Sequence, residues 1–231
     1  MPTVLITGCN RGIGQAFLKA YRSQGWTVIA GVRDPSTVTK EDGLIVVKIE
    51  SDSTTDAKAA VEELKWKYGV EKLDLVIANA AVHLTHAHLK DVDPDILDTT
   101  WKVNVRGPLI LFQAFYSLLG TDGKFVIISS GAGRIGKQQT PGGGAYGQSK
   151  AAVNFLVAKL HVEHPDLVVL ALNPGWVETD MGTQGAKWSG MDKTPLKVSD
   201  TLPGMLKVIE EAKKDTTSGK LVDYDGSIMS W

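Results

Sequence analysis

Short runs of β-branched and other apolar residues alternate with longer helical stretches along the chain, and this alternation restricts the fold more than any other feature. Most runs are apolar almost continuously rather than at every second residue, which is typical of strands covered on both faces. Strands that alternate with helices form a parallel sheet with right-handed crossovers. The sequence therefore predicts an α/β fold built on a doubly wound parallel sheet.

The elements of this sheet can be placed by their apolar runs and by glycines that end helices. The predicted strands are Thr3–Thr7, Thr27–Val32, Leu44–Ile49, Leu73–Ala78, Lys124–Ser129, Leu167–Leu172 and Lys220–Asp223. The predicted helices are Gly12–Gln24, Thr54–Tyr68, Asp95–Leu119, Ala145–His164 and Ser199–Lys213. Two glycine-rich stretches, Gly131–Gly144 and Gly182–Pro195, fit neither type, and we expect binding loops or lids there. A length of 231 residues suits a single domain, residues 1–231, without a separate substrate domain.

Composition excludes several classes of partner. The net charge is −1 and charged residues make up 22% of the chain, so neither nucleic acid nor an anionic membrane is expected to bind. No apolar run approaches the length of a membrane span, and the first strand begins without a basic leader. Cys9 is the sole cysteine, which rules out an intramolecular disulfide and fits a reducing compartment. We expect a cytoplasmic protein whose partner is a small molecule.

The segment Thr7-Gly8-Cys9-Asn10-Arg11-Gly12-Ile13-Gly14 follows the first strand and opens the first helix. Gly8 permits a sharp turn, Gly12 lets the backbone approach a pyrophosphate, and Gly14 lets helix and strand pack closely. The helix N-terminus adds unpaired N–H groups for phosphates. A plain glycine turn is the alternative, but the position between strand and helix favours a dinucleotide-binding Rossmann fold. The predicted cofactor residues of this turn are Gly8, Asn10, Arg11, Gly12, Ile13 and Gly14.

The charge at the end of the second strand indicates which cofactor binds. Enzymes that use NAD place a carboxylate there for the ribose 2′-hydroxyl, whereas those that use NADP place a cation there for the 2′-phosphate. Arg33 stands at that end and Arg11 lies in the glycine turn, so two guanidinium groups could hold one phosphate. Asp34 follows and would serve an NAD ribose, and each arginine could also be a solvated surface charge. We predict NADPH.

Tyr146 and Lys150 are four residues apart in a predicted helix and share one face. A free phenol has a pKa of about 10, too high for acid–base work near neutrality, and a nearby ammonium would lower it. Chance pairing on a helix is the alternative. However, Ser129 and Ser130 end the fifth strand, where open sheets place ligands, and a hydroxyl there could donate to a carbonyl oxygen as negative charge develops.

Two further polar residues along the chain are candidates for the same site. Asn79-Ala80-Ala81 ends the fourth strand, and Asn104 lies within a predicted helix, where an amide is by default a surface or kink residue. With the Thr-Gly-x-x-x-Gly-x-Gly spacing, the strand-five serine and the Tyr-x-x-x-Lys pair, these motifs resemble the short-chain dehydrogenase/reductase family. Asn173-Pro174-Gly175-Trp176-Val177-Glu178-Thr179 resembles the Pro-Gly segment of that family.

The resemblance implies a role for each matching residue. Ser130, the second of the pair, would be the active-site serine, and Asn104 would hold a water in a proton relay ending at Tyr146. The cofactor would also contact Asn79, Ala80, Tyr146, Lys150, Pro174, Gly175, Val177 and Thr179. Among subgroups, the chain looks most like the sniffer and C-factor branch and the fungal norsolorinic acid ketoreductases. Two departures are Ala81, where glycine is common, and a long loop before Tyr146.

Apolar side chains near the second glycine-rich stretch are candidates for the substrate wall. Trp176, Met181 and Trp188 could line a pocket for an aromatic substrate, or could simply pack a loop onto the core. Trp231 could lie in an interface of a homo-oligomer or fold over the pocket. The cluster His83, His86 and His88 lacks a second anchoring group for a metal, so a solvated loop near the rim of the site is expected and no metal is predicted.

These predictions converge on NADPH-dependent reduction of a ketone, aromatic or polyketide-derived, to a secondary alcohol. Asn104, Ser130, Tyr146 and Lys150 are the predicted catalytic residues. Two alternatives stay open. One is alcohol oxidation with NAD. The other, which the C-factor resemblance allows, is a nucleotide-binding signalling protein that needs no turnover.

Overall fold

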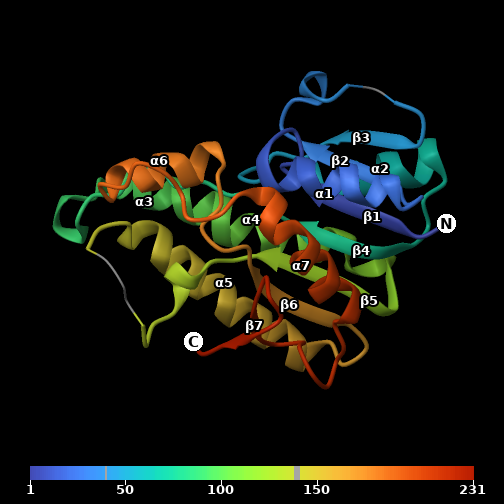
Figure 1. The fold of residues 1–231 in the computed structure, drawn as a ribbon. Helices are drawn as coiled ribbons and strands as arrows, with labels where there is room; N and C mark the ends of the chain where they lie inside the picture. The colour runs from blue at the N-terminus through green and yellow to red at the C-terminus, as the bar shows by residue number, and fades with distance from the viewer. Residues whose placement is uncertain (40, 138–140) are drawn as a thin grey trace.

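The computed structural model describes residues 1–39, 41–137 and 141–231, and one eight-stranded sheet crosses this part of the chain. Its strand order is β3-β2-β1-β4-β5-β6-β7-β8. Neighbouring strands are parallel except β8, which is antiparallel to β7. The strands are β1 (Thr3–Thr7), β2 (Thr27–Val32), β3 (Leu44–Lys48), β4 (Leu73–Ala78), β5 (Leu119–Ile128), β6 (Val168–Asn173), β7 (Leu221–Asp223) and β8 (Ile228–Met229). The predicted doubly wound Rossmann sheet is confirmed (Figure 1).

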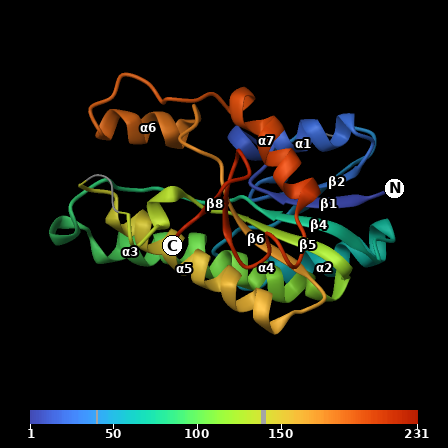
Figure 2. The same ribbon diagram turned by 60° about the horizontal axis from the view of Figure 1, so that its bottom comes forward.

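Helices cover both faces of the sheet (Figure 2). On one face, Phe17 of α1 and Met205 of α7 join one buried cluster with the strands. On the other face, Leu64 of α2, Phe115 of α4 and Val157 of α5 join a second cluster. The helices are α1 (Gly12–Ser23), α2 (Asp56–Tyr68), α3 (Pro94–Trp101), α4 (Gly107–Phe115), α5 (Gly144–Glu163), α6 (Asp180–Trp188) and α7 (Val198–Glu211). Apolar strands buried on both sides follow from this arrangement, as their continuous apolar runs predict.

The strand order reverses direction next to β1, because β2 and β3 lie on one side of it and β4 to β7 on the other. Ligands of open α/β sheets bind at such a switch point, beyond the carboxyl ends of the strands. α3 and α6 extend past this edge of the sheet (Figure 1). A ligand site is therefore expected in the segments that follow β1, β4, β5 and β6.

The largest difference from the sequence prediction is the helix expected over Asp95–Leu119. Lys102–Arg106 forms a π-helical segment that separates α3 from α4, and Tyr116–Leu118 forms a short 3-10 turn. A π segment adds a residue to one turn and is frequent at functional sites.

The two unassigned stretches contain local structure that the sequence analysis did not predict. Residues 182–195 begin inside α6, so this stretch is partly a helix rather than a loop. Gly131–Gly133 forms a 3-10 turn, whereas residues 138–140 of the first stretch lie outside the described residues. The two-residue strand β8 was also missed. Among the described residues, no helix combines the length and the apolar character needed to cross a lipid bilayer.

Candidate active site

A cleft of about 1480 Å³ opens at the carboxyl edge of the sheet. Most of the residues predicted for cofactor, catalysis and substrate line it. They are Gly8, Asn10, Arg11, Gly12, Ile13, Arg33, Asn79, Ala80, Ser130, Tyr146, Lys150, Pro174, Gly175, Trp176, Val177, Thr179 and Met181. The other three predicted residues, Gly14, Asn104 and Trp188, are not part of this lining. The fold therefore brings together segments that the sequence could associate only by motif order.

The glycine turn after β1 is packed so closely that side chains would not fit. Gly8 and Gly12 have φ values of +64° and +57°. A Cβ atom on Gly8 would lie 2.9 Å from the Cα of Ala80, and one on Gly14 would lie 2.4 Å from the carbonyl oxygen of Gly8. No side chain caps the N-terminus of α1, and its first turn holds no acidic residue. These N–H groups are consequently open to an anion.

Asn79 ties this turn to the end of β4. Its Nδ2 donates to the carbonyl oxygens of Thr7, at 2.9 Å, and Gly8, at 3.1 Å. In return, the hydroxyl of Thr7 accepts from the backbone N–H groups of Asn79 and Ala80. Asn79 thus holds the glycine turn against the end of β4, and it also lines the cleft.

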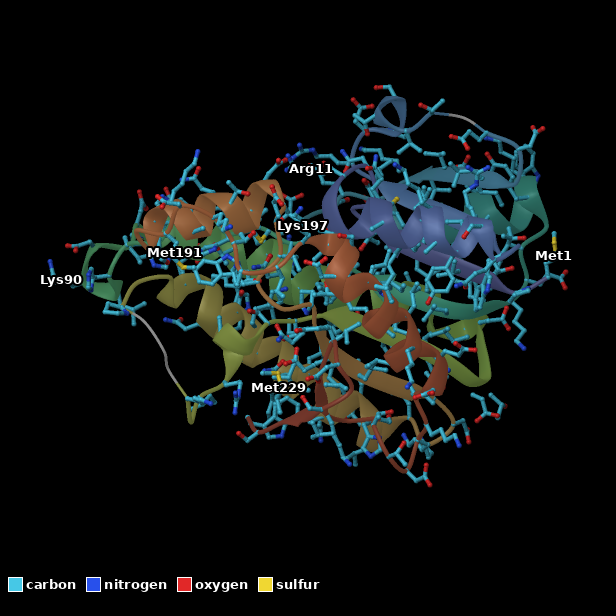
Figure 3. All side chains as sticks on the ribbon, viewed as in Figure 1. Met1, Arg11, Lys90, Met191, Lys197 and Met229 are labelled. Carbon is cyan, nitrogen blue, oxygen red and sulfur yellow. The ribbon has the colours of Figure 1, made fainter. Side chains whose placement is uncertain are left out.

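The two arginines proposed to hold a phosphate differ in their surroundings. Arg33 is exposed at the end of β2 and lines the cleft. Arg11 forms an ion pair with Asp180 at 2.7 Å, and both side chains are about three-quarters exposed (74% and 76%). Figure 3 shows Arg11 at the upper rim, between the glycine turn and α6. Such an exposed pair is weak and can rearrange for a stronger anion.

Asp34, which left the cofactor choice open, acts as a cap. Its Oδ1 accepts from the hydroxyl of Ser36 at 2.7 Å and from the N–H of the same residue at 2.9 Å. These bonds, led by the one from the Ser36 side chain, lower the pKa of the Asp34 carboxyl. The carboxylate is therefore engaged in starting the 3-10 turn Pro35–Thr37.

Tyr146 and Lys150 lie near the start of α5, and both line the cleft. Lys150 is buried, with 2% of its surface exposed, and its Nζ donates to the carbonyl oxygen of Ile128 at 2.8 Å. The same Nζ lies 5.5 Å from the centre of the Tyr146 ring. The Ser130 hydroxyl, at the end of β5, accepts from the N–H of Ala132 at 3.1 Å and hydrogen-bonds to Tyr146. A phenol, a hydroxyl and an ammonium thus share one corner of the cleft.

Burial determines the protonation states of Tyr146 and Lys150. It raises the pKa of Tyr146 to about 12, against a smaller lowering by the hydrogen bond with Ser130. It also lowers the pKa of Lys150 to about 8. Desolvation therefore dominates the pKa of the phenol in this structure, and a lowering by Lys150 is not among its causes. Tyr146 is a protonated acid at neutral pH.

The other serine of the pair has a structural partner. The hydroxyl of Ser129 donates to Oδ1 of Asn154 on α5 at 2.6 Å, and both residues are buried. This bond ties the end of β5 to the helix that carries Tyr146 and Lys150. Ser130 is then the hydroxyl of the pair that remains beside the phenol.

Asn104 is buried in the π-helical segment and serves the loop after β4. Its Oδ1 accepts from the N–H of Val82 at 2.8 Å, and its Nδ2 donates to the carbonyl oxygen of Val82 at 2.8 Å and to Oγ of Ser149 at 3.0 Å. Ser149 in turn donates to the carbonyl oxygen of Tyr146. The side chain therefore connects the loop to the first turn of α5, a contact that its position in the sequence did not reveal.

The Asn104→Ala variant is expected to lose about 3 kcal/mol of unfolding free energy. The substitution leaves both backbone groups of the half-buried Val82 without partners, and each such group costs roughly 1–3 kcal/mol. Urea denaturation would measure the loss. Lys102→Ala, at an exposed position of the same segment, is the matched control and should change stability by less than about 0.5 kcal/mol. Equal stability of the two variants would contradict this account.

Two histidines that were expected in a solvated loop are instead packed into the site. The ring of His83 stacks on the ring of Tyr146, with 4.5 Å between centroids and 21° between planes. Trp188 contacts the rings of both His83 and His86. The prediction of a solvated loop is therefore wrong for these residues, although His88 is exposed. Position directly after β4 was the signal that could have found them. Within the described residues, no three side chains of metal-binding type gather in one place.

The segment after β6 closes the cleft on the side of α6. Gly175 has a φ of +76°, and Thr179 caps α6 by accepting from the N–H of Gly182 at 3.0 Å. A Cβ atom on Gly12 would lie 3.4 Å from the Thr179 methyl, so this cap faces the glycine turn. Trp176 is fixed by donation from its Nε1 to the carbonyl oxygen of Gly182.

The chain end lies against the loop that follows β5. The N–H of Gly136 donates to the carbonyl oxygen of Trp231, and Arg134 donates to Ser230 through Nε and Nη2. Met229 lines the cleft from this side, a residue that the sequence analysis did not single out. Trp231 thus joins this loop through its backbone, whereas its indole is partly exposed.

Comparison with known proteins agrees with this architecture. Residues 2–190 match the family model described as short chain dehydrogenase. The chain is 36% identical to "Norsolorinic acid ketoreductase" of Aspergillus parasiticus, over 98% of this chain and 90% of that protein. It is 27% identical to an NADPH-bound carbonyl reductase from chicken fatty liver, with a TM-score of 0.86 over 100% of this chain and 99% of the other. Carbonyl reductase Sniffer of D. melanogaster, 24% identical, shares the fold with a TM-score of 0.88 over the full length of both chains.

The matched segment includes the glycine turn, Ser130, Tyr146 and Lys150, and the fungal relative aligns along nearly the whole chain. The chain belongs to the short-chain dehydrogenase/reductase family.

Proposed function

We propose that the protein is an NADPH-dependent ketoreductase that converts a ketone to a secondary alcohol, with Tyr146 as the proton donor. The observation that carries this proposal is the corner of the cleft where the phenol of Tyr146, the hydroxyl of Ser130 and the ammonium of Lys150 meet. A protonated phenol beside a hydroxyl donor suits a reaction in which a carbonyl oxygen becomes an alkoxide.

The residues present fit a dinucleotide. The close packing of Gly8, Gly12 and Gly14 leaves bare backbone where a pyrophosphate binds, and the uncapped N-terminus of α1 faces it. Asn10 and Ile13 belong to the same wall, as do Ala80, Pro174, Gly175, Val177 and Thr179. We propose that these residues hold the cofactor and that Lys150 reaches its ribose.

The surroundings of the charged groups favour NADPH over NADH. Arg33 is exposed on the cleft, whereas an oxygen of Asp34 is engaged by Ser36. A guanidinium suits a 2′-phosphate, and the carboxylate that follows it already accepts two hydrogen bonds from Ser36 through Oδ1. The solved carbonyl reductase from chicken fatty liver is described as NADPH-bound, which supports the same choice. Arg11 would leave Asp180 to join Arg33 at the phosphate.

When bound, the cofactor supplies a hydride to the carbonyl carbon of the substrate. Ser130 orients the carbonyl oxygen by donating a hydrogen bond to it. Tyr146 transfers its phenolic proton to that oxygen as negative charge develops there. Lys150, held by the carbonyl oxygen of Ile128, stabilises the phenolate that results. Asn104 keeps the loop after β4 and the first turn of α5 in register, and we propose that it also holds a water in a proton relay that ends at Tyr146.

Arg33→Ala is expected to weaken NADPH binding by about tenfold or more, because it removes a charge-assisted contact worth roughly 1.5–3 kcal/mol. NADH has no 2′-phosphate, so its affinity should change by less than about twofold. Fluorescence titration of both cofactors measures the two constants. Arg22→Ala, in the last turn of α1 and outside the cleft lining, is the charge-matched control for NADPH affinity. A variant that binds both cofactors as the wild type does would refute the assignment of Arg33.

For the substrate, we propose an aromatic or polyketide-derived ketone. Trp176 and Met181 line the cleft, and Trp188 contacts it through His83 and His86. Aromatic and thioether walls favour flat apolar ligands. The name of the Aspergillus parasiticus relative, norsolorinic acid ketoreductase, supports the reaction class.

We further propose that residues 1–231 act as one domain that carries both the cofactor and the substrate site. We propose a cytoplasmic location, which fits a chain whose sole cysteine, Cys9, can form no internal disulfide. Assembly into a homo-oligomer stays a prediction.

A further inference from the structure

The histidine pair after β4 presents polar atoms to which the proposed reaction assigns no role. His83 lies against the ring of Tyr146, and its centroid is 5.9 Å from that of His86. Trp188 packs with its edge on His83, at 68° between planes, and stacks on His86 at 18°. The two imidazoles and the indole form a flat-walled corner directly beside the proton donor.

Each imidazole has one nitrogen that is shielded from solvent and has no hydrogen-bond partner among the described residues. These atoms are Nε2 of His83 and Nδ1 of His86. Both face Gly143, because a Cβ atom built there would lie 3.2 Å from Nδ1 of His86 and 3.6 Å from Nε2 of His83. Gly143 therefore covers both nitrogens, and one small polar group that displaces this residue could contact both of them. A buried polar group without a partner destabilises the protein, and a ligand that pairs with it removes this cost.

The protonation of His83 limits which group can bind. Burial and then the neighbouring His86 lower the pKa of His83 to about 4, so the ring is neutral at pH 7. A hydrogen bond with the backbone of Thr85 opposes this shift, which means that a carbonyl oxygen accepts the ring proton. Because Nε2 has no partner, Nδ1 carries that proton, and Nε2 is a bare acceptor. A neutral hydroxyl satisfies it by donating, whereas an ether or a carbonyl cannot.

We propose that His83 and His86 form a hydroxyl-binding subsite, and that the preferred substrates are flat aromatic ketones that carry a phenolic hydroxyl. The hydroxyl donates to Nε2 of His83, and its oxygen faces Nδ1 of His86. The ring of the substrate lies between the aromatic walls, and Trp188 shifts to admit it. This inference rests on the proposed function, since the ketone must reach Tyr146 at the same time.

A panel of small ketones tests the subsite. It contains acetophenone, its three monohydroxy isomers and the three corresponding methoxy ethers, each assayed by the loss of NADPH absorbance. For one isomer, we expect kcat/KM at least tenfold above both acetophenone and the matching ether, because a site built to bond a hydroxyl rejects analogues that lack it. The wild-type data alone overturn the proposal if no hydroxy isomer has a higher kcat/KM than its matching ether.

Variants then assign the preference to the histidines. His83→Phe keeps a flat ring against Tyr146 but removes Nε2, so the ratio of kcat/KM between the hydroxy ketone and its ether should fall to within about twofold. His88→Phe, in the same loop but exposed, is the matched control and should keep the wild-type ratio. If His83→Phe is not folded, as checked by NADPH binding, His86→Phe gives the same comparison. A preference unchanged in these variants would refute the subsite. Failure of the wild type to reduce any ketone would instead refute the proposed function.

Discussion

Tyr146→Phe is expected to lower kcat for ketone reduction by about 1,000-fold or more, while NADPH binds with affinity within about threefold of the wild type. General acids contribute typically 100- to 10,000-fold, and the substitution removes the acid while keeping the ring. The phenyl ring can still stack on His83, so the corner of the cleft should keep its shape. Steady-state kinetics and fluorescence titration measure the two quantities separately.

The matched control is Tyr116→Phe, which removes an exposed phenol directly after α4 and outside the cleft lining, and should leave kcat unchanged. A Tyr146→Phe enzyme with more than a tenth of the wild-type kcat would refute the assignment of the proton donor. The same variant distinguishes a reductase from the alternative of a nucleotide-binding signalling protein. A protein that only binds nucleotide would keep its biological role without the phenol, whereas a reductase would lose it.

Gly14→Ala is expected to lower the unfolding free energy by about 4 kcal/mol and to weaken NADPH binding by at least 100-fold. The added methyl carbon would lie 2.4 Å from the carbonyl oxygen of Gly8 and 2.5 Å from Nδ2 of Asn79. Backbone cannot yield as a flexible side chain does, so the glycine turn and its support by Asn79 must shift together. Overpacking of this kind usually costs 1–3 kcal/mol and more where both neighbours are fixed. Thermal unfolding should show a decrease of about 10 °C.

Gly185→Ala is the matched control, since it makes the same change inside a helix. Its Cβ atom would meet its nearest neighbour, the ring of Trp176, at an ordinary 3.7 Å. Alanine favours helix by up to about 1 kcal/mol over glycine, so this variant should be as stable as the wild type or more stable. Equal melting temperatures for Gly14→Ala and Gly185→Ala would show that the close contact at Gly14 is not needed.

Much of the fold could be predicted from local sequence because its signals repeat. The strands β1, β2 and β4 have the predicted bounds, and Gly25 and Gly69 adopt the positive φ values expected where helices end. The π-helical segment could not be predicted, since it changes the path of the chain without changing which residues are apolar. β8 is two residues long and has no pattern of its own.

The candidate site was predictable where a residue type and its position in the fold coincide. Tyr146, Lys150 and Ser130 follow from spacing and from the carboxyl ends of strands. The role of His83 was not predictable, because an imidazole next to a phenol across 63 positions of sequence leaves no local trace. The capping role of Asp34 likewise depends on a turn whose hydrogen bonds are formed only in the folded chain.

The catalytic candidates and the residues that shape the cleft lie on different elements, and this affects how the substrate range of the protein can change. Tyr146 and Lys150 project from α5, whose buried face is part of the core, whereas His83, Trp188 and Met229 come from segments beyond the carboxyl edge of the sheet or at its border. Replacing a rim residue alters the shape offered to a ligand without repacking the interior. New substrates are therefore accessible by single substitutions, and the chemistry itself is passed on intact from one variant to the next.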